Sequence, residues 1–207
     1  MDNDDDTFTY TYTVTYDDGN DTATYNVQEV KVYENYPTGD LYDSYTKTYN
    51  VYDSNSTLVG TLTDALTYTT NGYTSSVNEE NYTTGTVSTA NVTAAIINGL
   101  NIFTIDTDNS NYVVAEESYT YTSSDSSYTE TYSVTDTDNT SQNTATYTIT
   151  VTGNQTNPDI PTTYTVTDSA NNVVRTVTDT YFLNSQGNYG IRQFEGSDNK
   201  TITISQI

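Results

Sequence analysis

Residues 8–14 read Phe-Thr-Tyr-Thr-Tyr-Thr-Val, so large apolar side chains alternate strictly with threonine. Successive side chains of a β-strand point to opposite faces, and the alternation therefore predicts a strand with one apolar face and one hydroxyl face. Similar stretches return at residues 45–51, 128–134 and 160–166. A strand type that recurs between turn-forming residues predicts an all-β chain of antiparallel hairpins.

The four stretches fall into two pairs with similar spacing. Residues 49–64 align with residues 164–179 without a gap, and the first members of the two pairs agree less closely. We expect an internal duplication that gives two tandem Ig-like antiparallel β-sandwich modules. The first module is predicted over residues 1–110 and the second over residues 118–207.

Only one segment favours a helix. Residues 91–98 read Asn-Val-Thr-Ala-Ala-Ile-Ile-Asn and precede Gly99, which is a suitable helix C-cap. The sequence therefore predicts at most one short helix, near residues 90–99.

The apolar content is low for a folded chain. Hydrophobic residues make up 33% of the sequence, against roughly 45–50% in an average globular protein. The 22 tyrosines and four phenylalanines compensate, because a tyrosine buries a large ring while its hydroxyl reaches water or a neighbour. We therefore expect a folded chain with a tyrosine-rich core.

The charge balance excludes several function classes. The chain carries 28 acidic residues against five basic ones, a formal net charge of −23. Binding to nucleic acid needs clusters of Lys and Arg, which five scattered residues do not supply. Anionic membrane surfaces are disfavoured for the same reason. No apolar run approaches the roughly 18 residues of a membrane-spanning helix, so no membrane insertion is expected.

Met1 is followed by Asp2-Asn-Asp-Asp-Asp6, which is unlike an export signal. The sequence therefore predicts either a chain made and used without secretion or a mature fragment of a secreted protein.

Catalytic side chains are scarce. The chain contains neither cysteine nor histidine, which removes disulfides, thiolate metal sites and the Ser-His triad. The adjacent acids Glu79-Glu80 and Glu116-Glu117 suggest the carboxyl pair of a glycosidase. Neighbouring residues of a strand point to opposite faces, so neither pair forms a facing dyad. We expect no enzyme.

Acidic residues in the turns make calcium the cofactor to consider, because Ca²⁺ prefers hard oxygen ligands. None of the clusters completes the loop of an EF-hand. Solvated turns are the competing interpretation, and the two stay open. The candidate metal ligands are Asp17, Asp18, Asp21, Asp106, Asp108, Asp136 and Asp138.

Lys47 and Glu130 occupy equivalent positions in two of the repeated strands, each between aromatic neighbours. A position that accepts opposite charges is typical of an exposed or edge site, and we expect both residues there.

Strands such as residues 144–152, which read Thr-Ala-Thr-Tyr-Thr-Ile-Thr-Val-Thr, are similar in composition to Ig-like modules of bacterial surface proteins and of phage virions. This resemblance implies a non-enzymatic structural protein on the exterior of a particle, foremost a phage virion protein such as a capsid decoration or fibre component. Its location would be the virion surface. Its partner would be a capsid protein or a neighbouring subunit in a homo-oligomeric or multi-copy assembly, contacted through residues 201–207.

The alternative is a secreted cell-surface adhesin or filament subunit that binds carbohydrate or protein, stabilised by calcium. That protein would be extracellular or held at the cell surface.

Overall fold

The alternating stretches of the described residues form β-strands. The computed structural model describes residues 7–33, 44–69, 72–97, 100–183 and 187–206, and these residues form 14 β-strands and no helix. The strands are β1 (Thr7–Asp17), β2 (Thr22–Tyr33), β3 (Tyr45–Tyr52), β4 (Leu58–Thr69), β5 (Gly72–Asn81), β6 (Thr86–Ile97), β7 (Leu100–Thr107), β8 (Ser110–Thr122), β9 (Ser127–Asp138), β10 (Thr144–Asn154), β11 (Thr162–Asp168), β12 (Val173–Leu183), β13 (Tyr189–Gly196) and β14 (Thr201–Gln206).

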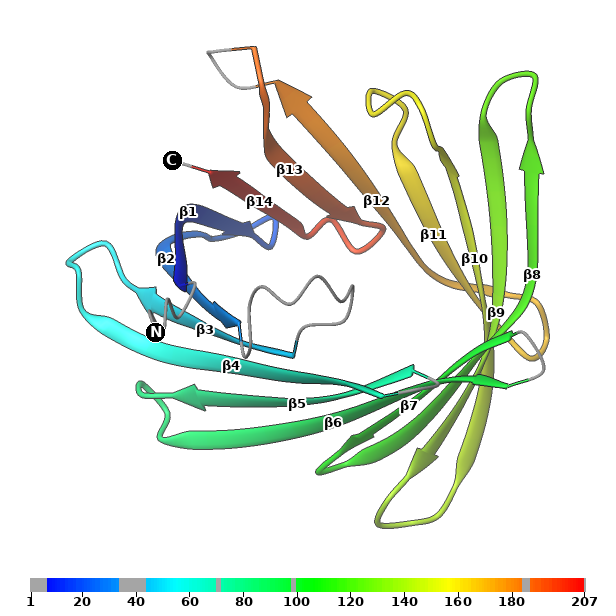
Figure 1. The fold of residues 1–207 in the computed structure, drawn as a ribbon, viewed down its shortest axis with the longest axis horizontal. Coiled ribbons are helices and arrows are strands. Elements are labelled where there is room, and N and C mark those ends of the chain that lie inside the picture. Colours follow the sequence, from blue (N-terminus) through cyan, green and yellow to red (C-terminus); the bar gives the residue numbers. More distant parts are fainter. Residues whose placement is uncertain (1–6, 34–43, 70–71, 98–99, 184–186, 207) are drawn as a thin grey trace, which may run out of the picture.

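The strands form one closed antiparallel barrel. Each strand pairs with its neighbours in sequence, and β1 pairs with β14 to close the ring (Figure 1). The closing register runs from Tyr12 opposite Gln206 to Asp17 opposite Thr201. All-β structure and antiparallel pairing are thus confirmed.

The predicted tandem Ig-like sandwiches are wrong. Both predicted ranges contribute strands to the same barrel, and the predicted boundary lies inside β8. The described residues therefore form no tandem repeat of independent modules. Local alternation is the same in a sandwich and in a barrel, so it did not distinguish the two architectures.

The predicted helix near residues 90–99 is also wrong over its described part. Residues 90–97 belong to β6, which pairs with β5 on one side and β7 on the other. Val92 and Ala94 lie on one face of the strand and Thr93 on the other. The side chains here therefore alternate with the two-residue period that is typical of a strand. Asn98 and Gly99 lie outside the described residues.

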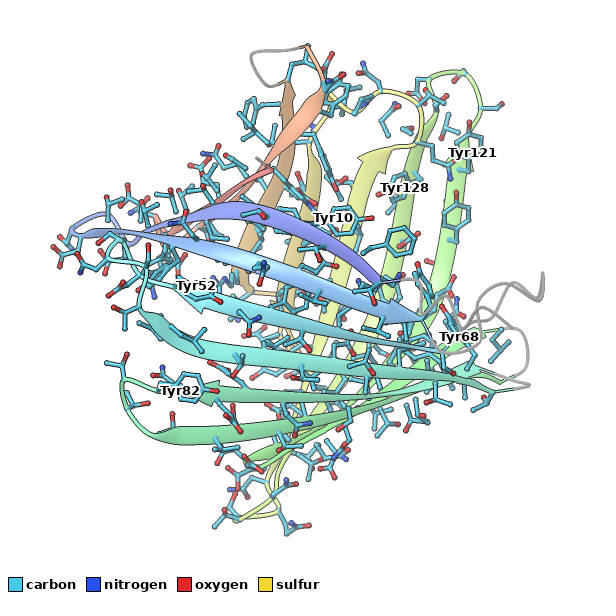
Figure 2. All side chains as sticks on the ribbon, turned by 60° about the vertical axis from the view of Figure 1, so that its left-hand side comes forward. Tyr10, Tyr52, Tyr68, Tyr82, Tyr121 and Tyr128 are labelled. Carbon is cyan, nitrogen blue, oxygen red and sulfur yellow. The ribbon has the colours of Figure 1, made fainter. Side chains whose placement is uncertain are left out.

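The pairing register keeps the apolar residues of neighbouring strands on a common face. Val27 lies opposite Tyr12 of β1 and Val51 of β3, while Thr13 lies opposite Asn26 on the other face. Side chains cover both faces of the wall (Figure 2). The face that carries Tyr12 is concave, because Tyr49 of β3 and Tyr181 of β12 line one cavity with it.

The interior is not filled by a conventional core. Among the described residues the buried hydrophobic side chains are Leu66, Ala94, Val134 and Val151, and no large side chain is fully buried. A barrel of about eight strands is just wide enough for its own side chains to fill it. The 14-stranded ring is wider, so much of its apolar inner wall faces open space.

The C-terminal strand is not a free edge. β14 pairs with β13 and with β1, so both of its edges are hydrogen-bonded within the barrel. Addition of a partner strand there would require these pairs to open. Ile207 and the acidic residues 1–6 lie outside the described part.

Candidate functional site

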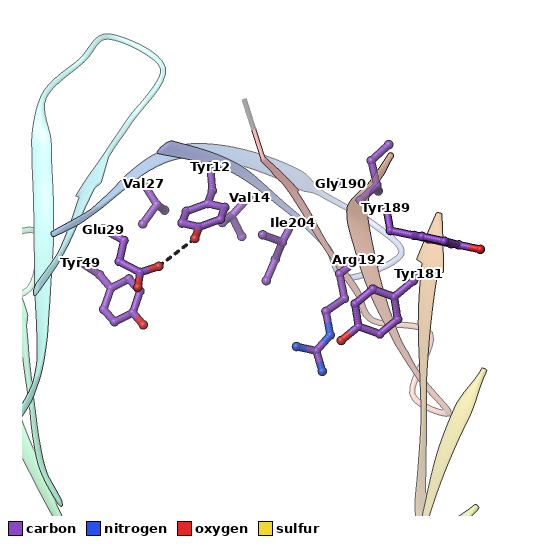
Figure 3. A pocket seen from close by; sticks show the side chains of 11 residues that line it. Tyr12, Val14, Val27, Glu29, Tyr49, Tyr181, Tyr189, Gly190, Arg192 and Ile204 are labelled. Carbon is purple, nitrogen blue, oxygen red and sulfur yellow. Dashed lines mark hydrogen bonds between the residues drawn. The ribbon is translucent and has the colours of Figure 1, made fainter. Parts of the chain in front are cut away.

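Aromatic and charged side chains of the inner wall surround a cavity of about 410 Å³ between β1–β3 and β12–β14 (Figure 3). Figure 3 shows Tyr12, Glu29 and Tyr49 on one side of this space and Tyr181 and Arg192 on the other. The apolar part of its lining includes Tyr12, Val14, Val27, Tyr49, Tyr181 and Ile204. We name it the first cavity.

Glu29 is the carboxylate of the first cavity. It is 8% exposed, and the hydroxyl of Tyr12 donates a hydrogen bond of 2.9 Å to its Oε2. Lys47 Nζ lies 3.9 Å from its Oε1. A buried charge without partners would be costly, and these two contacts supply them.

Tyrosine ionisation is suppressed around Glu29. Burial, followed by the hydrogen bond to Glu29, raises the pKa of the Tyr12 hydroxyl well above its ordinary value. Burial raises the pKa of Tyr49 to about 12, and the negative charges of Glu29 and Asp64 act in the same direction. Both rings therefore face the cavity as neutral hydrogen-bonding groups at physiological pH.

Arg192 faces the cavity from the opposite side. Its Nε and Nη2 donate to the carboxylate of Asp179, with Nη2 at 2.6 Å from Oδ2. Asp179 is 3% exposed. The guanidinium carbon lies 5.0 Å from the ring centre of Tyr181 and 4.6 Å from that of Phe194. The carboxylate and the two rings hold the guanidinium in place.

A second cavity of about 380 Å³ lies on the inner wall across β8–β11. Tyr128, Tyr132 and Tyr164 contribute rings, Glu130 contributes a carboxylate, and Val114, Ile149 and Val151 complete the apolar lining. The Tyr132 hydroxyl donates to Glu130 Oε2 at 2.7 Å. Burial, followed by this hydrogen bond, raises the pKa of Tyr132.

The predicted calcium ligands do not gather at one place. Among the described residues no group of three or more acidic side chains is arranged to hold a metal ion. Asp18 and Asp138 instead accept backbone N–H bonds within their own turns, from Asn20 and Asp21 and from Thr140 and Ser141 respectively. These bonds lower the pKa of both carboxyls.

The other candidate ligands are spread over both faces of the wall. Asp17 accepts a hydrogen bond from the backbone of Gly19, and Asp21 belongs to the same turn. Asp106 lies opposite Asn91 and Asn111 in the sheet, on the outward face. Calcium binding stays a prediction.

Asp108 follows β7, and Asp136 lies opposite Tyr112 and Ala145 on the inner face. The Oδ1 atom of Asp136 is buried and has no hydrogen-bond partner among the described residues.

The adjacent acids behave as expected for strand neighbours. Glu116 accepts a hydrogen bond from Asn101, whereas Glu117 accepts one from Ser133. Neither carboxylate faces the other.

Glu29, Asp179 and Arg192 were not predicted as site residues, and the predicted exposed or edge position of Lys47 and Glu130 is wrong. All five lie on the inner wall, at positions that continue the apolar face. The signal in the sequence was a charged residue at a position where the alternating pattern otherwise has an apolar residue. It was interpreted as an exposed or edge position because no local pattern indicates an interior wide enough to hold charges.

Comparisons with known proteins add little. No known protein family matches the sequence, and no curated protein matches it. A domain of an outer membrane lipoprotein-sorting protein from Vibrio parahaemolyticus has a similar solved structure, with 8% sequence identity over 97% of this chain and 83% of that chain, and a TM-score of 0.41. A similarity this distant carries no inference about function. Within the described ranges, no helix has the length and apolarity needed to cross a membrane.

Proposed function

We propose that this barrel binds a small apolar or amphiphilic molecule in its interior, and that it acts by binding and not by catalysis. The observation that carries the proposal is an aromatic and aliphatic inner wall that the barrel's own side chains leave unfilled. Apolar surface facing water is unfavourable, and a ligand that covers it gains roughly 25 cal/mol per Å² of apolar area removed from water.

The first cavity has the features of a small-molecule site. Its volume of about 410 Å³ lies within the range of roughly 300–1,000 Å³ that is usual for such sites. Its walls are mainly Tyr, Val and Ile, with Glu29 and Arg192 as polar groups on opposite sides. Because Tyr12 and Asp179 already hold these two charges in place, they can orient a ligand without reorganising.

The virion prediction is not retained. It was tied to tandem Ig-like modules, and the closed barrel contains none. The adhesin alternative, the protein partner and the surface location are not tested by the structure and stay predictions.

The experiment is a fluorescence titration with N-phenylnaphthylamine, an uncharged probe that brightens in apolar surroundings. The probe is expected to bind, and to raise the unfolding free energy by about 2.7 kcal/mol when its free concentration is about 100 times its Kd. Val27→Trp fills the first cavity and is expected to weaken binding about tenfold or more, because inserting a larger side chain costs roughly 1–3 kcal/mol.

The matched control is Asn26→Trp, which adds the same ring to the exposed neighbouring residue on the outer face. It should leave the affinity unchanged. Absence of probe binding to the unmodified protein, or equal weakening by the two variants, would contradict the proposal.

A further inference from the structure

The second cavity combines aromatic rings with a carboxylate that lacks a cation. Tyr128, Tyr132 and Tyr164 line it together with Glu130. Glu130 accepts a hydrogen bond from Tyr132, and among the described residues it forms no ion pair. An aromatic cage beside a carboxylate is the arrangement that proteins use to bind ammonium groups.

The wall formed by β2 and β3 shows the same arrangement with its cations in place. Lys31 Nζ lies 4.2 Å from the ring centre of Tyr33 and 4.3 Å from that of Tyr45. Lys47 Nζ lies 5.1 Å from the Tyr45 ring centre and 3.9 Å from Glu29. Here the protein supplies its own ammonium groups to the rings and the carboxylate.

One strand of each wall carries the same five-residue pattern with a single difference. Residues 45–49 read Tyr-Thr-Lys-Thr-Tyr and residues 128–132 read Tyr-Thr-Glu-Thr-Tyr. The exchange of Lys47 for Glu130 removes a cation and adds an anion on the inner wall. Arg192 of β13 lies over Tyr181 and Phe194 and is bound to Asp179.

We propose that the second cavity binds the alkylammonium head group of a small amphiphile, with the cation against Glu130 and the tyrosine rings. The apolar tail then lies along Val114, Ile149 and Val151. This inference rests on the proposed function, since it names the class of molecule that the interior takes. The net charge of −23 supports it, because the field of the whole protein attracts cations and repels anions.

The cage is built before any ligand arrives. Tyr128 lies opposite Gly153, and a Cβ at Gly153 would come within 2.8 Å of the Tyr128 ring. Because Gly153 has no side chain, the Tyr128 ring can lie directly against the sheet. On its other side Tyr128 stacks on Tyr119, with ring centres 6.4 Å apart.

The test is isothermal titration calorimetry with decyltrimethylammonium below its micelle-forming concentration. Glu130→Gln keeps the shape of the side chain and removes its charge, and it is expected to weaken binding about tenfold. The matched control is Glu195→Gln, the same change at an exposed position of β13 on the outer face. It should leave the affinity unchanged.

Two further arms test the charge and the rings. Decyl sulfate has the same tail with the opposite charge, and it should bind more weakly than the ammonium and gain affinity in Glu130→Gln. Tyr164→Leu removes one ring and is expected to weaken ammonium binding about fivefold. Circular dichroism melting checks that each variant is folded.

The outcomes separate the two proposals. If Glu130→Gln and Glu195→Gln weaken binding equally, or if decyl sulfate binds as tightly as the ammonium, the head-group assignment is wrong. Val27-dependent binding of the uncharged probe would then still support the proposed function. If neither the probe nor the ammonium binds, the proposed function fails as well.

Discussion

The β2–β3 wall and the β9–β11 wall use the same alternating strand but handle charge differently. In the β2–β3 wall, Lys31 and Lys47 lie over tyrosine rings, and Lys47 also pairs with Glu29. In the β9–β11 wall, the equivalent position is Glu130, bound by the Tyr132 hydroxyl alone among the described residues. One wall is internally neutralised, and the other presents an unpaired carboxylate to the lumen.

The difference teaches that a charge on the apolar face of a strand has two distinct uses. Where opposite charges and rings surround it, the charge is part of the barrel's own packing. Where rings surround it without a counter-charge, as around Glu130, we infer that the charge binds a cationic ligand.

The largest expected effect is alkaline unfolding, which involves both walls. Burial raises the pKa of Tyr49 from 10.0 to about 12, and it raises that of Tyr132 as well. The folded state therefore prefers neutral tyrosine, so stability is fully present below the unfolded-state pKa of 10.0 and is lost as the pH rises through about 12. Tyrosinate absorbance and far-ultraviolet circular dichroism should change together in that window. Ionisation of all tyrosines near pH 10 without unfolding would contradict burial of these rings.

Lys47→Glu should destabilise the β2–β3 wall. The new carboxylate would lie close to Glu29 and opposite Asp64. Lys31, opposite it on β2, would then face three carboxylates instead of two. We expect a loss of about 3 kcal/mol in unfolding free energy, the scale of removing one partner from a buried ion pair. Urea denaturation measures it. A loss below about 0.5 kcal/mol would show that the wall is not internally neutralised.

Gly153→Ala should disturb the β9–β11 wall and leave the β2–β3 wall unchanged. The added methyl group would meet the Tyr128 ring, which must move out of the cage. Overpacking of this kind costs roughly 1–3 kcal/mol. We expect weaker ammonium binding together with unchanged affinity for the uncharged probe in the first cavity. Parallel titration of both ligands checks this, and equal loss of both would mean a global distortion.

Glu130→Lys is the mirror image of the Lys47 variant and should have the smallest effect. It gives the β9–β11 wall its own ammonium group beside Tyr128 and Tyr132. A cation–π contact stabilises by about 0.5–1 kcal/mol. Urea denaturation should show a small gain, and calorimetry should show that ammonium binding is lost. A large destabilisation would mean that the two walls are not equivalent.

Sequence alone predicted the local structure well. Alternation at residues 8–14 correctly predicted the strand, its antiparallel pairing and the separation of tyrosine from threonine. Asp53 and Asp168 hold corresponding turns, each accepting two backbone N–H groups, and the gapless alignment had matched these positions. These features depend on contacts between residues that are close in sequence, and local sequence patterns predict such contacts.

Closure of the barrel could not be predicted in the same way. It depends on the pairing of β1 with β14, which lie at opposite ends of the chain and carry no mutual signal in a single sequence. The site depends on closure, since only a wide ring brings Tyr49 and Arg192 to one cavity. The same gap explains why Lys47 and Glu130 were predicted at exposed or edge positions.

The central claim is that the tyrosine-lined face encloses a lumen that receives a small molecule. A crystal structure of the protein grown with N-phenylnaphthylamine tests it most directly. We predict a closed ring of 14 strands with the probe between Tyr12, Tyr49 and Arg192. A collapsed barrel whose side chains fill its own interior, or a probe bound to the threonine face, would contradict the account.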